Sequence, residues 1–345
     1  MLNVIYLHGT KFINSVTDQQ FNDNTVLWLH DTINYSTLDQ LIAKFGNPRY
    51  IVNDNNFGHH DKSIYGLPLF LEKEIQLFKN LDFVDNVETK SCFNFMINKK
   101  SENRRLLLKL VEYFNLSTEY YTYSGLCVNA DMSRVIEELE TLKDQSWPPM
   151  STEEYDNFKF VLLASCNIPS NIINYPGQIN SNSSILNYGG NQWTWVNGLD
   201  DIFQNTAVSL ISESVDYQKV SCVTEKTGYS VLGLTFPIWV GGYGIADAWG
   251  AAGLDTFDDI VDHSYQHKNT LIERCYHAVA DNIKLLTDLN FVQEKRNQCL
   301  ARLIDNRKKI LNGILTDYCY QAIQTWPKDL SSVVYPLINK VYSRK

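Results

Sequence analysis

The sequence predicts an α/β protein with two domains. Short β-branched or aromatic runs alternate with segments of helical spacing, which favours parallel strands joined by helices. The chain has 345 residues, more than a single hydrophobic core usually supports. Residues 144–158 are polar and contain a double proline, which predicts a linker or a long surface loop. We expect domains at 1–90 and 91–290, with C-terminal helices over 291–345 that pack across both.

Three short runs in the N-terminal part predict strands, because each is β-branched or aromatic and ends at a polar turn. They are 3–7, 25–29 and 49–52. Residues 37–46 carry apolar side chains at helical spacing and end in glycine, which predicts a helix between two parallel strands. A second amphipathic helix is expected over 69–81.

The remainder of the chain repeats this alternation and then becomes helical. Strands are expected at 91–98, 207–214 and 237–242. Helices are expected at 99–115, 133–145, after the stretch Cys222–Lys226, at 245–253, 269–289, 291–313 and about 316–342.

Composition is that of an ordinary globular protein, with 44% hydrophobic and 20% charged residues and a net charge of −9. The seven cysteines are scattered and form no C-x-x-C pair, which favours free buried thiols in a reducing compartment. The first residues predict a strand rather than a signal peptide, and no apolar run approaches the roughly 20 residues of a membrane helix. We therefore expect a soluble cytoplasmic protein without a membrane span.

Several common catalytic patterns are absent from the sequence. It has no G-x-x-x-x-G-K-[ST], G-x-G-x-x-G, G-x-S-x-G or H-E-x-x-H pattern, and no D-x-D to hold a divalent ion. His59 and His60 are adjacent, and we expect them in a polar loop rather than at a metal. No metal site is expected.

The stretch Cys-Val-Thr-Glu-Lys, residues 222–226, predicts the start of a helix with Thr224 as its N-cap. Glu225 and Lys226 then lie in the first turn, where free N–H groups favour an anion such as a diphosphate. An ammonium group there can neutralise charge on a departing diphosphate, and a carboxylate can accept two ribose hydroxyls. The alternative is a solvated, ion-paired first turn.

The order of these pieces resembles the donor half of GT-B glycosyltransferases, specifically the fucosyltransferase-like enzymes of phage and other viral genomes. The elements that carry the resemblance are Ser212-Glu213-Ser214, Cys222 to Lys226, and Pro237 to Gly242. Similarity continues through 253–265 and back to 93–116, and so covers most of 91–290. The resemblance implies two Rossmann-like domains facing a cleft. It also implies metal-independent, inverting sugar transfer from a UDP- or GDP-sugar.

The resemblance assigns Lys226 to the diphosphate and Glu225 to the ribose, with Thr224 and Glu213 beside them. Arg104 or Arg105, at the start of the helix after the strand 91–98, is implied to reach the same phosphates. Gly242 and Gly244 would let the backbone approach the sugar or the phosphate, although plain turn glycines are the alternative.

An inverting transfer also needs a base for the acceptor hydroxyl. By the resemblance this base follows a strand of the N-terminal domain, where Asp31 is our first candidate and His8 and His59 are reserves. Each is equally consistent with an ordinary loop residue.

The resemblance implies that the acceptor is either a surface glycan or a hydroxymethylated pyrimidine in phage DNA. Residues 291–313 favour DNA to a degree, because six basic residues face only two acidic ones and such a helix can follow phosphates. Ordinary solvated helix charge is the competing interpretation. A non-catalytic carbohydrate- or nucleic-acid-binding protein on a glycosyltransferase-like fold is the alternative function.

Overall fold

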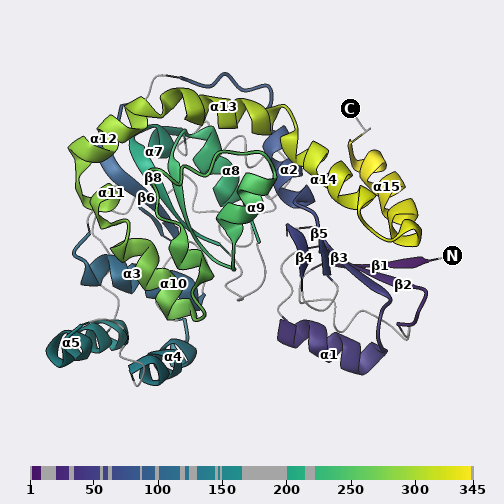
Figure 1. The fold of residues 1–345 in the computed structure, drawn as a ribbon, viewed down its shortest axis with the longest axis horizontal. Helices are drawn as coiled ribbons and strands as arrows, with labels where there is room; N and C mark the ends of the chain where they lie inside the picture. Colours follow the sequence, from purple (N-terminus) through teal and green to yellow (C-terminus); the bar gives the residue numbers. More distant parts are fainter. Residues whose placement is uncertain are drawn as a thin grey trace.

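The structure is a computed structural model of the chain. It describes residues 2–8, 21–30, 35–54, 57–60, 64–85, 88–97, 101–116, 121–123, 130–143, 147, 150–164, 200–213 and 222–342. The described part is an α/β protein with two separate sheets, both mainly parallel and both covered by helices (Figure 1). The prediction of a parallel α/β architecture is confirmed.

The first sheet has the strand order β1-β2-β3-β5-β4. Its strands are β1 (Asn3–His8), β2 (Thr25–His30), β3 (Tyr50–Asn53), β4 (Gly58–His60) and β5 (Ile64–Gly66). All neighbours are parallel except β4, which runs antiparallel to β5 at the edge. The strand β4 is a correction to the polar loop expected around His59 and His60.

Helices cover both faces of the first sheet, and they come from distant parts of the chain. On one face lies α1 (Tyr35–Phe45), where Leu38 and Leu41 pack against Leu27 and Ile51. The other face is covered by α14 (Ile314–Gln324) and α15 (Lys328–Tyr342), which lie above this sheet in Figure 1. The C-terminal helices therefore complete the core of the N-terminal strands.

The second sheet is wholly parallel among its four described strands, in the order β7-β6-β8-β9. They are β6 (Ser91–Ile97), β7 (Tyr121–Tyr123), β8 (Thr206–Ser212) and β9 (Phe236–Val240). Every residue of β8 and β9 is buried, as expected for strands covered on both faces.

One face of the second sheet packs against a helical layer that includes α3 (Glu102–Tyr113), α10 (Leu271–Ala280) and α12 (Leu289–Gln298). The other face packs against α8 (Glu225–Leu232) and α9 (Ile245–Ala251). Further helices are α2 (Leu69–Gln76), α4 (Ser133–Lys143), α5 (Thr152–Leu163), α7 (Asp200–Gln204), α11 (Ile283–Thr287), α13 (Leu300–Leu311) and the 3₁₀ helix η5 (Ser264–His267).

The two sheets are joined through α2, which packs against α8, α13 and α14. Gly228 permits this closeness, because a Cβ atom at that position would lie 2.5 Å from Cδ1 of Ile75. Phe57, just before β4, adds an edge-to-face contact with Trp249 of α9, at 6.4 Å between ring centroids.

Four predicted segments differ from the structure. The expected linker 144–158 contains the start of α5, where Ser151 and Glu154 form a capping box that begins the helix at Thr152. The expected helix 291–313 is two helices that break at Cys299, and the segments 269–289 and 316–342 are likewise each divided into two.

Candidate functional site

The strand order of the second sheet marks one position where a ligand can bind. From β6 the chain moves to β7 on one side, and it later returns to β8 on the other side. In open parallel sheets, ligands bind outside the carboxyl ends of the two strands that flank such a change of direction. The candidate site is therefore built from the residues that follow β6 and β8.

The amino end of α3 is attached to the end of β8 by Asn103. Its buried amide Nδ2 donates to the carbonyl oxygen of Glu213 at 2.8 Å, and its Oδ1 accepts from the backbone N–H of Arg104 at 3.0 Å. The amino end of α8 begins at the same place, because Glu213 and Thr224 are in contact. Two helix amino ends, each with a partial positive charge, thus meet beside β8.

The carboxylate of Glu213 is fully buried and caps α8. It accepts from the backbone N–H of Thr224 at 3.1 Å, and from the hydroxyls of Thr224 and Thr227 at 2.5 Å each. Thr224 is the N-cap by position, as predicted, but its own side chain accepts no capping bond from the helix. The protein itself therefore uses the Glu213 carboxylate as a cap of α8, whereas the sequence analysis placed this residue beside the bound nucleotide sugar.

Lys226 lies in the first turn of α8 with only 9% of its side chain exposed. Its ammonium Nζ lies 3.1 Å from Oε1 of Glu225 and 3.2 Å from the hydroxyl oxygen of Thr224. An ammonium group has three N–H donors, so the described residues provide acceptors for two of them. The ammonium is turned into the protein at the amino end of the helix, whereas 32% of the Glu225 side chain is exposed.

The end of β9 is tied to the same turn of α8. The indole N–H of Trp239 donates to the hydroxyl oxygen of Thr227 at 3.0 Å, and the backbone N–H of Glu213 donates to the carbonyl of Val240 at 2.8 Å. After Val240 the chain turns through Gly244, whose φ of +67° requires the left-handed conformation that glycine tolerates. Gly242 has no such requirement, because its φ is not positive.

His263 belongs to this site although sequence reasoning did not find it. Its ring contacts that of Trp239 at 5.3 Å between centroids, with the ring planes tilted by 34°, and burial lowers the pKa of the imidazole below its ordinary value. The contacts fit a neutral ring that donates from Nε2 to the carbonyl of Thr256 at 2.9 Å and accepts at Nδ1 from the amide of Gln266 at 3.3 Å. No local motif marks this histidine, because its partners meet only in the folded chain.

The two predicted arginines behave differently. Arg105 donates from Nη1 to the carbonyl oxygen of Ala130 at 2.5 Å, so it holds the segment ahead of α4. Arg104 is 2% exposed in the first turn of α3, next to Asn103. Only Arg104 stays a candidate for an anion at the switch between β6 and β8.

The predicted bases follow strands of the first sheet, as far as the structure describes them. His8 ends β1 and is paired in register with His30 at the end of β2. Asp31 lies outside the described residues. His59 lies within the antiparallel edge strand β4, opposite Tyr65, and not in the loop after a parallel strand as expected.

The carboxyl ends of the two sheets face the same region of the molecule. In Figure 1 the strands β1 and β8 run from opposite sides toward the middle. The contact between Phe57 and Trp249 joins the segment that follows β3 to the helix that follows β9. Among the candidates that the structure describes, His8 is at the carboxyl end of a parallel strand of the first sheet.

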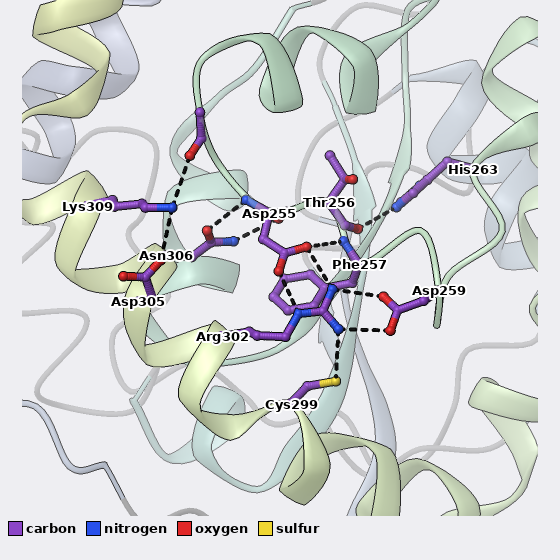
Figure 2. A network of polar contacts seen from close by, with 11 residues as sticks. Asp255, Thr256, Phe257, Asp259, His263, Cys299, Arg302, Asp305, Asn306 and Lys309 are labelled. Carbon is purple, nitrogen blue, oxygen red and sulfur yellow. Dashed lines mark hydrogen bonds and ion pairs between the residues drawn. The ribbon is translucent and has the colours of Figure 1, made fainter.

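The basic residues of 291–313 are mostly engaged within the protein. Arg302 forms two hydrogen bonds to Asp255, of 2.6 and 3.0 Å, and two to Asp259, of 2.8 and 2.9 Å (Figure 2). Lys309 pairs with Asp305 and also donates to the carbonyl of Gly253. Arg307 binds Asp85 and backbone carbonyls, and Arg296 is completely buried. Four of the six charges thus have partners within the protein, and these contacts do not favour a phosphate-binding helix.

In the described part of the chain, no helix is both long and apolar enough to cross a membrane. Among the same residues, no three His, Cys, Asp or Glu side chains gather where they could hold a metal ion. No protein-family model, no curated protein and no solved structure matches this chain.

Proposed function

We propose that the chain is a glycosyltransferase of the GT-B type, which moves a sugar from a UDP- or GDP-sugar to a hydroxyl group with inversion and without a metal. The observation that carries this proposal is the placement of Lys226. Its ammonium is buried at the amino end of α8, where Thr224 contacts both Lys226 and Glu213 at the carboxyl end of β8. A diphosphate that leaves during sugar transfer needs such a cation.

Charge at the site supports an anionic ligand. Lys226 and Arg104 contribute two positive charges, and the amino ends of α3 and α8 add about half a charge each. Glu213 and Glu225 remove two. The sum is about one positive charge in a largely buried setting, which favours phosphate groups.

The roles follow from position. Lys226 binds the diphosphate through the N–H that lacks an acceptor among the described residues, and Arg104 assists from α3. Glu225 is the more exposed member of its ion pair, so its carboxylate accepts the ribose hydroxyls. The acceptor hydroxyl is deprotonated from the first sheet, by Asp31 or His8, with His59 less favoured because of its place in β4.

A glycan is the better acceptor candidate. Binding of duplex DNA depends on several Lys or Arg side chains that are available to phosphates. In α12 and α13, Arg296, Arg302, Arg307 and Lys309 are bound to internal partners instead.

A second function, a non-catalytic binding protein, is favoured by one observation. Glu213 already caps α8, and Lys226 already has two partners, so this edge is largely satisfied without a ligand. A binder of neutral carbohydrate needs no more than that.

Titration calorimetry with UDP, GDP and CMP, and with their sugar conjugates, tests the proposal. We expect binding by one nucleotide class, and Lys226→Gln should weaken it about tenfold to a hundredfold, or about 1.4 to 2.8 kcal/mol. Lys308→Gln is the matched control, because Lys308 is exposed on α13. If no nucleotide binds the folded wild-type protein, the donor site does not exist.

Turnover separates the two functions once a nucleotide binds. Release of nucleoside diphosphate should be assayed with simple glycans and with hydroxymethylcytosine DNA as acceptors. Transfer to glycans supports the enzyme with our preferred acceptor, and transfer to DNA corrects that preference. Tight nucleotide-sugar binding without hydrolysis or transfer would leave the binding protein as the better description.

A further inference from the structure

Tyr243 stands out in the turn that follows β9. It has 42% of its surface exposed, while its neighbours Gly242 and Gly244 are buried. The turn lies at the carboxyl edge of the second sheet, three residues after Val240, whose carbonyl accepts from Glu213. Three residues span at most about 10 Å, so the tyrosine lies close to the candidate diphosphate site.

Tyr243 does not stand alone on this surface. Its ring contacts the ring of His267 with 5.0 Å between centroids and an interplanar angle of 58°. Nε2 of His267 lies 2.7 Å from Oδ2 of Asp247, and both of these side chains are about half exposed or more. The three residues form one contiguous, partly exposed cluster of an aromatic ring, an imidazole ring and a carboxylate, which we call the corner.

The backbone holds this corner in place without a ligand. The amide of Gln266 accepts, through Oε1, a 2.8 Å hydrogen bond from the backbone N–H of Ala246, which fixes η5 to the start of α9. Gly244 fixes the direction in which the turn enters α9, because it occupies the left-handed region. Neighbouring Trp249 of α9 contacts Phe57, so the corner lies near the boundary between the two sheets. A rigid surface loses little conformational entropy when it binds.

The chemistry of the corner selects a neutral ring with hydroxyl groups. An exposed aromatic face binds an apolar ring face, and a carboxylate beside an imidazole accepts hydroxyl donors. The negative charge of Asp247 opposes a phosphate group at this position.

We propose that Tyr243, His267 and Asp247 form a sugar-binding corner that positions the transferred sugar or the acceptor sugar next to the diphosphate site. This proposal rests on the proposed function for the identity of the neighbouring site. The corner itself is a carbohydrate site that can be tested without it.

The test compares Tyr243→Ala, Tyr243→Phe and Asp247→Asn in the full chain. Tyr335→Ala is the matched control, because Tyr335 is 46% exposed on α15 and also contacts a tyrosine, Tyr320. Titration calorimetry should use UDP, GDP, UDP-glucose, UDP-galactose, GDP-mannose and GDP-fucose. Saturation-transfer NMR should use methyl glycosides of the same sugars.

We expect Tyr243→Ala to weaken binding of the preferred nucleotide sugar or methyl glycoside about tenfold. Binding of the free nucleoside diphosphate should stay unchanged, and Tyr243→Phe should retain most of the affinity because the ring remains. A tenfold loss for the nucleotide sugar identifies the transferred sugar as the ligand, and a loss confined to methyl glycosides identifies the acceptor.

The outcomes separate this proposal from the function beside it. If Lys226→Gln weakens nucleotide binding but Tyr243→Ala changes no affinity, the corner is not a sugar site and the donor site stands. If no nucleotide binds, but methyl glycosides bind the wild type and not Tyr243→Ala, the sugar-binding corner is supported and the proposed glycosyltransferase is overturned. If the folded protein binds neither sugars nor nucleotide sugars, the proposal of a sugar-binding corner is overturned.

Discussion

The two edges of the second sheet meet opposite ends of the flanking helices. At the amino edge, α7 and α8 end just before β8 and β9, and their carbonyl groups are met by the buried guanidinium of Arg296. At the carboxyl edge, α3 and α8 begin, and their N–H groups are met by Asn103 and Glu213. Each edge thus supplies the charge that the helix dipoles favour.

The two edges differ in how many of the N–H groups of their buried cations have hydrogen-bond acceptors. All five N–H groups of Arg296 donate, to the carbonyls of Phe203, Gln204, Gly233 and Leu234 and to the hydroxyl of Thr89. The carboxyl edge instead keeps one N–H of Lys226 without an acceptor among the described residues, and it exposes Tyr243. The amino edge is closed by side chains of the protein, and the carboxyl edge is the one at which we propose that a ligand binds.

The largest expected effect is at the amino edge. Arg296→Met should lower the free energy of unfolding by about 3 to 5 kcal/mol, because four buried carbonyls lose their donor. Urea denaturation measures this loss, with Lys308→Met as the exposed control. A loss below about 1 kcal/mol would mean that the amino edge is not closed by this residue.

A smaller effect is expected for the anion of the carboxyl edge. Glu213→Gln should cost about 2 kcal/mol, because three hydrogen bonds to a buried carboxylate are weakened and the amide places a donor against Thr224 or Thr227. The exposed Glu137→Gln serves as the control in the same urea experiment. An unchanged free energy of unfolding in Glu213→Gln would show that the Glu213 cap does not stabilise the fold. The two edges would then differ more in their contribution to stability than we describe.

The ion pairs of Arg302 sharpen the comparison, because they lie at the surface rather than at either edge. Arg302→Gln should cost about 1 kcal/mol, since exposed pairs are screened by solvent. Burial alone would raise the pKa of Asp255, but hydrogen bonds from Arg302 and from the Phe257 N–H leave it below the ordinary value. The hydrogen bond from Arg302 lowers the pKa of Asp259 as well.

Carboxylates with lowered pKa values stabilise the protein above their unfolded pKa, near pH 3.9, and lose that contribution as the pH falls through the folded values. The wild type should therefore lose more stability than Arg302→Gln on acidification below about pH 4. Equal acid profiles would show that these ion pairs do not contribute.

The smallest effect is expected for His263. Its lowered pKa means that the unfolded chain binds a proton more readily, so stability is present above about pH 6.5 and declines as the pH falls. Urea denaturation at about pH 7.5 and about pH 5.5 should show a decline in the wild type that is smaller in His263→Gln. His267→Gln is the matched control, and an identical decline in all three proteins would contradict a buried neutral ring.

The sequence predicts the carboxyl edge better than the amino edge. The start of α8 at Glu225, the N-cap position of Thr224 and the strands β8 and β9 all follow from local patterns, and the structure confirms them. Local patterns are sufficient there because a strand end and a helix start lie within a few residues of each other.

The amino edge depends on contacts that no local pattern contains. Arg296 lies 62 residues after Leu234 and 92 after Gln204, so its partners cannot be identified before the fold is known. Glu213 was expected beside the donor but caps α8 instead. The cap could not be predicted for the same reason, because Thr224 and Thr227 approach Glu213 only in the folded chain. The prediction of a linker at 144–158 missed a local signal. Ser151 and Glu154 have the spacing of a capping box, which predicts the start of α5.

The position of α14 and α15 has a consequence for biosynthesis. Val26, Trp28 and Val52 form one face of the first sheet, and they pack against Ile323, Val334 and other residues of these helices. A nascent chain therefore exposes that apolar face until the ribosome has passed residue 338. Removal of α14 and α15 would leave this apolar face of the opening strands uncovered.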